Sequence, residues 1–255
     1  MRWLSWVPFV AACGGDGDDD ADTDTDPVAD TDLGPDTDPP RDMNAVLRVL
    51  GYEFPTGDFG GSVLVDFFRT EQPYVAEMAS TLPVDTCAVT LHSTGTPPGT
   101  TTPSDERPGA GLVTAGVGGE QLSLVNGIAT LDGWPTGQTV SFSASGAEVP
   151  VFAVPALLVI PDAPLGAASA ENPDGSVDLS WGGASTPSPV RISVAGSFGV
   201  VDCSVTDSGS FTVPAAELAQ VESGGQYLVA RSVAVVESLP GVTVTGWAQV
   251  SAFAD

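Results

Sequence analysis

Catalytic chemistry needs ionisable side chains at defined spacings, and this sequence offers few of them. His92 is the only histidine, so no other residue could supply the imidazole base of a serine or cysteine nucleophile. It begins a Thr- and Pro-rich stretch, residues 92–108, in which a base would be poorly positioned. No GxSxG, HExxH or CxxC motif accompanies it. We therefore expect no histidine-based catalysis and no metal site, because zinc requires three or four N or S ligands.

Glycoside hydrolysis is a second chemistry to consider, because it needs only two carboxyl groups about 5–9 Å apart. The carboxylates available in the part of the chain expected to fold are Asp58, Asp66, Glu77, Asp105, Glu106, Asp178 and Asp202. Nothing in the sequence pairs any two of them. Asp66, Asp178 and Asp202 alternate with apolar residues, which is typical of the outward face of a strand. The sequence thus predicts a protein that is not an enzyme and has no cofactor, with a surface polysaccharide hydrolase as the alternative.

Aromatic side chains could instead form a stacking surface for sugars. The candidates are Trp134, Trp181, Trp247, Tyr74 and Tyr227. Trp181 and Trp247 lie in strand-like sequence and are expected in a core. Trp134 stands in a turn-like Asp-Gly-Trp-Pro sequence, so it is the candidate ligand contact. A carbohydrate-binding or adhesion module is a further alternative, provided that a second aromatic side chain lies beside Trp134.

The first thirteen residues indicate where the protein is located. Arg2 precedes an apolar run, residues 3–12, and Val10-Ala11-Ala12-Cys13 closes this run with small residues before a cysteine. Ten helical residues rise about 15 Å, too little for a hydrocarbon core of about 30 Å, so the run predicts an export signal. Val-Ala-Ala-Cys resembles the lipobox of bacterial lipoproteins, and this resemblance implies that Cys13 is acylated and becomes the N-terminus. The alternative is an ordinary signal peptide in which Cys13 is incidental.

An acidic segment follows the cysteine. Twelve of the 33 acidic residues are aspartates between Asp16 and Asp42, a composition that predicts a disordered spacer. Asp22, Asp24 and Asp26 have the spacing of the first three EF-hand ligands, but the required Gly and Glu are missing, so only loose Ca²⁺ binding is expected. The net charge of −26 excludes nucleic acid as a partner.

The two other cysteines, Cys87 and Cys203, lie in similar sequences, Val84-Asp-Thr-Cys-Ala-Val-Thr90 and Val201-Asp-Cys-Ser-Val-Thr206. In an exported chain such a pair suggests a disulfide. If the two sequences are equivalent strands of separate domains, however, the Cα atoms lie beyond the reach of about 7 Å that a disulfide has. The favoured interpretation is two buried, unpaired thiols, with a disulfide as the alternative.

From Met43 onward the chain consists of short β-branched and aromatic runs between Gly and Pro residues, which predict strands. Asn126-Gly127 predicts a type I′ hairpin turn, and Pro214 with Gly224-Gly225 brackets the one predicted helix, residues 214–221. Residues 175–181 have the sequence Gly-Ser-Val-Asp-Leu-Ser-Trp. This sequence resembles the second strand of fibronectin type III and similar immunoglobulin-like modules, in which a Trp packs between the sheets.

The prediction is an all-β protein with two tandem immunoglobulin-like β-sandwiches after a disordered tether. The segments are a signal peptide (1–12), the lipidated cysteine and acidic tether (13–42), and sandwich domains 43–160 and 161–255. This layout resembles that of tethered lipoproteins of predatory or social deltaproteobacteria. The resemblance implies no particular activity. We expect an exported protein, anchored through Cys13 to the cell envelope, with the outer membrane as the expected membrane. It would present binding or structural modules to an envelope protein or polysaccharide.

Overall fold

The computed structural model describes residues 42–53, 57–70, 82–91, 109–182 and 189–254. All of them belong to one compact unit, Pro39–Asp255. The predicted signal peptide, the lipidated Cys13 and the acidic tether up to Arg41 lie outside the described residues. Within the described ranges, no helix has the length and apolar composition needed to cross a membrane.

Most of the described residues belong to strands, with one short helix, and this confirms the all-β prediction. The elements are β1 (Asp42–Glu53), β2 (Phe59–Thr70), β3 (Thr86–Leu91), β4 (Val113–Val117), β5 (Glu120–Leu122), β6 (Ile128–Leu131), β7 (Thr139–Ala144), β8 (Phe152–Val159), β9 (Ala168–Glu171), β10 (Val177–Ser180), β11 (Val190–Gly196), β12 (Gly199–Val205), β13 (Ser210–Val213), α1 (Ala215–Val221), β14 (Ser223–Leu239) and β15 (Val242–Ala254).

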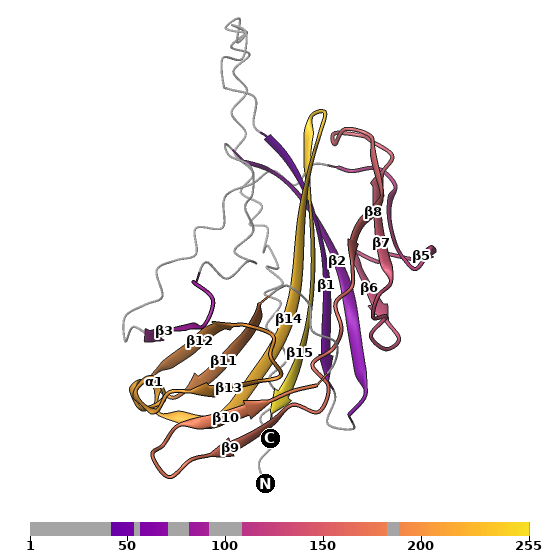
Figure 1. Ribbon diagram of the computed structural model, residues 1–255. Helices are drawn as coiled ribbons and strands as arrows, with labels where there is room; N and C mark the ends of the chain where they lie inside the picture. Colours follow the sequence, from indigo (N-terminus) through magenta and orange to yellow (C-terminus); the bar gives the residue numbers. More distant parts are fainter. Residues whose placement is uncertain (1–41, 54–56, 71–81, 92–108, 183–188, 255) are drawn as a thin grey trace, which may run out of the picture. The chain divides into compact units, whose positions relative to one another are not determined.

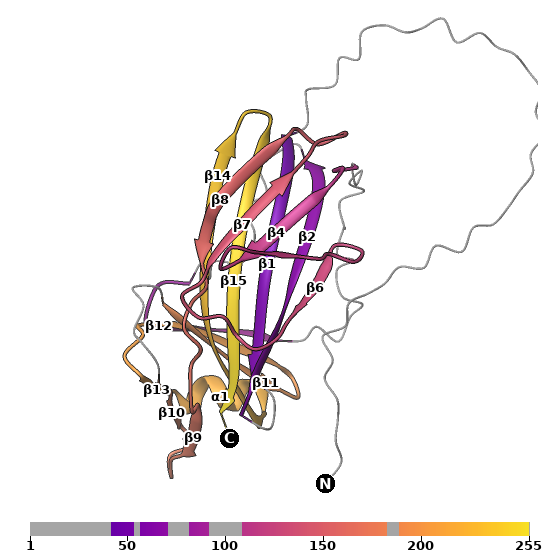
Figure 2. The ribbon, with the colours of Figure 1, turned by 90° about the vertical axis from the view of Figure 1, so that its right-hand side faces the viewer.

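One large sheet runs through the unit, with strand order β3-β12-β11-β14-β15-β1-β2-β6 (Figure 1). A four-stranded sheet, β5-β4-β7-β8, packs on its long strands, and Figure 2 shows β7 and β8 in front of β14, β15 and β1. A three-stranded sheet, β13-β10-β9, packs with α1 on the other end of the large sheet. The architecture is therefore that of two sandwiches.

The predicted boundary between residues 160 and 161 separates the two smaller sheets but not the large one. Strands from before and after the boundary share the large sheet, because β1 pairs in parallel with β15 and β3 pairs with β12. Alternating apolar residues identify a strand and its buried face, but they do not identify a pairing partner far away in the chain. The two sandwiches are thus joined through a common layer.

The first core lies between the large sheet and the four-stranded sheet. Ala45, Leu47 and Val49 of β1 point into it with less than 1 % exposure, as the period of two in a strand requires. From the facing sheet, Phe142 and Phe152 meet edge to face with ring centroids 5.1 Å apart. Twenty buried apolar residues make up this core.

The second core lies between the large sheet and the layer formed by the three-stranded sheet and α1. Ile192 of β11, Leu179 of β10 and Leu218 of α1 are buried in it. Trp181 is 5 % exposed and lies in this core, as the sequence predicts. Helix α1 also occurs where predicted, starting after Pro214 and ending at Val221; the next residue, Glu222, has a left-handed backbone with φ of 48°.

Cys87 and Cys203 form a disulfide, with Cα atoms 4.0 Å apart. The favoured prediction of two unpaired thiols was wrong. The two similar sequences are not equivalent strands of separate domains, because β3 pairs antiparallel with β12 and sets Cys87 directly opposite Cys203. The alternative interpretation, a disulfide between the two cysteines, is the one that the structure supports.

Candidate functional site

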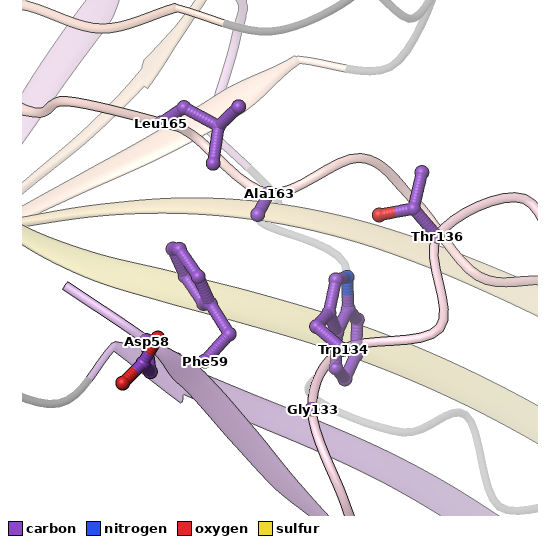
Figure 3. Close-up of a pocket in the computed structure, with 7 residues that line it drawn as sticks. All are labelled: Asp58, Phe59, Gly133, Trp134, Thr136, Ala163 and Leu165. Atoms are coloured by element: carbon purple, nitrogen blue, oxygen red, sulfur yellow. The ribbon is translucent and has the colours of Figure 1, made fainter.

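A hollow of about 450 Å³ opens where the two sandwiches join (Figure 3). It is formed by the start of β2, the loop between β6 and β7, and the stretch that follows β8. Its lining residues are Asp58, Phe59, Gly133, Trp134, Thr136, Ala163 and Leu165. The candidate ligand contact of the sequence analysis therefore lies in a concave surface.

Trp134 is held in one orientation. Its indole Nε1 donates a hydrogen bond to the carbonyl oxygen of Pro161 at 2.7 Å. The ring lies over the backbone of Gly51 on β1, where an added Cβ would lie 2.3 Å from a ring carbon. A glycine is therefore needed beneath the indole, since real Cβ contacts do not become so short. The side chain is half-buried and packs against the first core.

The opposite wall of the hollow, residues 161–165, is held by a buried arginine. Arg231 Nη1 donates to the carbonyl oxygen of Ala163 at 2.9 Å. The backbone amide of Gly182 donates to the carbonyl oxygen of Leu165 at 2.7 Å. Together with the bond from Trp134 to Pro161, these contacts hold three of the five residues of the wall by their carbonyl oxygens. The hollow is therefore preorganised.

Arg231 can remain buried because Asp207 neutralises it. The guanidinium makes two parallel bonds to the carboxylate, Nε to Oδ2 at 2.8 Å and Nη2 to Oδ1 at 3.0 Å. Both side chains are 2 % exposed. The indole Nε1 of Trp181 adds a third bond to Asp207, at 2.8 Å. Such bidentate geometry is what a buried ion pair needs to offset the loss of hydration.

The lining residues combine apolar rings with polar groups at the rim. Phe59 and Trp134 both line the hollow, and Leu165, 55 % exposed, adds an aliphatic side chain (Figure 3). Asp58 and Thr136 are exposed and supply a carboxylate and a hydroxyl. This combination suits a ligand with one apolar face and hydroxyl or basic groups around its edge.

Trp134 is predictable from the sequence as a ligand contact, but its neighbours in the hollow are not. Phe59 begins β2, and no short-range pattern links it to Trp134, which lies far along the chain. Leu165 lies in the stretch between the two smaller sheets, and its exposure depends on the fold. Trp247 lies half-buried opposite Arg48 and outside both cores, in contrast to the prediction. Tyr227 is 3 % exposed and belongs to the second core.

The carboxylates expected on outward strand faces do lie there. Asp66 pairs with Arg48 on the neighbouring strand. Asp202 pairs with Arg191 at 2.9 Å, and Asp178 accepts a hydrogen bond from Thr212 Oγ1 at 2.6 Å.

The remaining candidates, His92, Glu77, Asp105, Glu106 and Tyr74, lie outside the described residues. Within the part of the chain that the structure describes, no group of three or more His, Cys, Asp or Glu side chains could hold a metal ion.

A second hollow, of about 420 Å³, lies on the three-stranded sheet. It is lined mostly by small residues, namely Ala168, Ser169, Ala170, Ser180, Ser210 and Thr212, with Asp178, Leu179 and Phe211. Phe211 is its only aromatic lining residue. A phenylalanine ring has no N–H group that could fix its orientation by a hydrogen bond, as the indole of Trp134 has. The hollow at Trp134 is therefore the better candidate site.

Comparison with protein-family models, with curated proteins and with solved structures finds no match to this chain.

Proposed function

We propose that this chain is a lipid-anchored protein of the cell envelope that presents a non-catalytic binding surface, and that the hollow at Trp134 is this surface. The observation that carries the proposal is the fixed indole. Hydrogen bonding to Pro161 and packing on Gly51 hold the ring, while the same residue lines an open hollow beside Phe59. A preorganised aromatic group loses little conformational entropy when a ligand binds.

The proposed anchor rests on the N-terminal sequence. A basic residue, an apolar run and Val-Ala-Ala-Cys13 together have the pattern of a lipoprotein signal. Acyl chains on Cys13 would bind the membrane with about 0.8 kcal/mol per buried CH₂. The acidic residues that follow would then separate the anchor from β1. The anchoring membrane in this proposal is the outer membrane.

The test of the anchor is the intact mass of the protein purified from its native membrane. We expect a mass that lacks residues 1–12 and carries a diacylglyceryl-type addition on Cys13. Cys13→Ala should release the protein from membrane fractions. An unmodified mass, or unchanged partitioning of the variant into detergent, would contradict the proposed anchor without affecting the proposed binding surface.

A carbohydrate-binding or adhesion module is the second candidate, because Phe59 lines the same hollow as Trp134 and supplies a second aromatic side chain. Sugar rings stack their C–H faces on aromatic rings, and their hydroxyl groups donate to carboxylates such as Asp58. Among its lining residues the hollow holds one carboxylate, whereas glycoside hydrolysis uses two. The geometry therefore favours binding over hydrolysis of a polysaccharide.

The binding test uses a panel of soluble neutral polysaccharides and affinity electrophoresis of the purified chain. Trp134→Ala should weaken binding at least about tenfold, as expected for a central aromatic contact. Phe198→Ala is the matched control, because this ring is 52 % exposed and does not line the hollow. Equal losses in both variants would contradict the assignment, and release of reducing ends would favour the hydrolase.

A further inference from the structure

Strand β3 is an edge of the large sheet. It pairs with β12 over six residues, from Gly199 opposite Leu91 to Ser204 opposite Thr86. No other described strand lies beside it, and Figure 1 shows it at the end of the strand order. An edge strand exposes a row of backbone N–H and C=O groups that can pair with another chain.

The other sheet edges carry features that discourage pairing. Strand β8 contains Pro155, which cannot donate a hydrogen bond. Strands β5 and β9 have three and four residues and include Glu120 and Glu171. Strands β6 and β13 have four residues each. In contrast, β3 has six residues, Thr-Cys-Ala-Val-Thr-Leu, without a charge, a proline or a glycine.

The disulfide identifies the backbone groups that face the open edge. Opposed residues in antiparallel strands alternate between pairs that exchange two hydrogen bonds, with Cα atoms about 5.5 Å apart, and pairs that exchange none, at about 4.5 Å. The Cα atoms of Cys87 and Cys203 are 4.0 Å apart, so this pair is of the second kind. The N–H and C=O groups of Cys87, and by alternation those of Val89 and Leu91, therefore point away from β12.

We propose that this edge pairs antiparallel with β3 of a second copy of the chain, across a two-fold axis at Val89. Directly opposed residues must share a face of the sheet. With the axis at Val89, this valine lies opposite its own equivalent, and Cys87 lies opposite Leu91 of the second copy. These opposed pairs are the residues whose backbone groups face outward, so each pair exchanges two hydrogen bonds.

A second copy fits the edge better than a charged peptide does. Residues 86–91 carry no charge, so two copies oppose no like charges along the strand. Asp85, the acid that precedes the strand in the sequence, is already engaged by the amide of Thr206 at 2.8 Å and by its Oγ1 at 3.1 Å. Leu91, 57 % exposed in the single chain, gains an apolar neighbour across the axis.

The disulfide keeps the edge available for pairing. Cys87 is bonded to Cys203, which is fully buried in the second core, so β3 cannot separate from β12 when a partner strand approaches. Two six-residue strands bury less than the roughly 1,200 Å² of a stable interface. We therefore expect a weak, reversible dimer that strengthens with salt, because salt screens the repulsion between two acidic chains.

The test is sedimentation velocity of the purified full-length chain between about 1 µM and about 1 mM. The wild type should form a reversible dimer. Val89→Pro should weaken the dimer at least about tenfold, because proline removes an outward N–H while the ladder with β12 keeps its bonds. Val89→Ala is the matched control, since it loses the same packing but keeps the N–H, and it should stay within about threefold of the wild type.

A second measurement applies if Val89→Pro fails to fold. Hydrogen exchange of the wild-type chain should show slower exchange of the Val89 and Leu91 amides at high than at low protein concentration. A wild type that stays monomeric over the whole range would overturn the proposal, even if it binds an added extended peptide. Concentration-independent exchange at both amides, or equal dimerisation of the folded Pro and Ala variants, would also overturn it.

Discussion

The two cores of this protein are stabilised in different ways. The first contains 20 buried apolar residues between the large sheet and a four-stranded sheet. The second contains 15 buried residues, and its facing sheet consists of three strands of four residues each. Only the second is accompanied, among the described residues, by a disulfide and by a buried ion pair, Arg231 with Asp207.

This difference follows from the area that each pair of sheets can bury. Small layers bury a smaller fraction of their apolar surface, so small folds commonly depend on cross-links. In the second sandwich the disulfide joins β3 to β12. The ion pair joins Arg231 of β14 to Asp207, in the turn between β12 and β13. The comparison predicts that cross-links matter most in the second core and close packing in the first.

The largest effect is expected from Arg231→Ala. The change leaves Asp207 buried without its partner, and losing one member of a buried pair costs about 3–5 kcal/mol in the free energy of unfolding. Urea denaturation measures this cost. Arg191→Ala is the control, because the Arg191 side chain is 45 % exposed and its pair with Asp202 should contribute no more than about 1 kcal/mol. Similar small losses in both variants would show that the buried pair does not stabilise the second core.

Replacing both cysteines, Cys87→Ala with Cys203→Ala, should cost about 2–4 kcal/mol. The bond closes a chain segment of 116 residues, so removing it leaves the unfolded chain many more conformations. Thermal unfolding of the double variant, compared with the wild type before and after reduction, measures the effect. Unchanged stability would mean that the second core does not need the cross-link.

Packing of the first core is tested by Gly51→Ala, beneath the indole of Trp134. The new Cβ would lie 2.3 Å from the ring, so the ring must move, at a cost of about 1–3 kcal/mol. Tryptophan fluorescence and urea denaturation report the movement and the cost. At Gly109, the control position, the nearest atom to an added Cβ is 3.4 Å away, and Gly109→Ala should change little. A silent Gly51→Ala would contradict the fixed orientation of the indole.

The smallest effect concerns the turn between β9 and β10. The hydroxyl and the backbone amide of Ser176 donate to Asp174 Oδ1 at 2.7 and 2.9 Å, and these bonds hold the pKa of the Asp174 carboxyl below its usual value of 3.8. Because the pKa of Asp174 is lower in the folded chain than in the unfolded chain, the ionised carboxylate stabilises the fold. This stabilisation is complete above the usual pKa and is lost as the pH falls below it. Asp174→Asn should therefore reduce the acid sensitivity of the melting temperature between about pH 5 and about pH 2. An unchanged acid sensitivity would contradict this contribution.

Local features of the fold could be predicted because they depend on neighbouring residues. Asn126 and Gly127 both have positive φ, 52° and 76°, as a type I′ turn requires. Helix α1 and the buried face of the strand before Trp181 likewise follow from short-range patterns. Each feature has its cause within a few residues.

The features missed from the sequence depend on residues that are far apart in the chain. The parallel pairing of β1 with β15, and the position of Cys87 opposite Cys203, arise only when the large sheet assembles. For the same reason Phe59 could not be assigned to the site of Trp134. Single-sequence patterns indicate which side of a strand is buried, but they do not specify what lies against it.

The parallel pairing of β1 also has a mechanical consequence. Any pull on the chain ahead of Asp42 acts along β1, an interior strand bonded to β15 from Asn44 to Tyr52 and to β2 from Asp42 to Glu53. The hydrogen bonds of the antiparallel ladder with β2 lie perpendicular to the strands and those of the parallel ladder with β15 are slanted, so a pull along β1 loads both ladders in shear at once. Such loading in shear requires many bonds to break together, whereas an edge strand pulled sideways unzips one bond at a time. A protein attached through its N-terminus and bound elsewhere would therefore resist extension through the middle of its largest sheet.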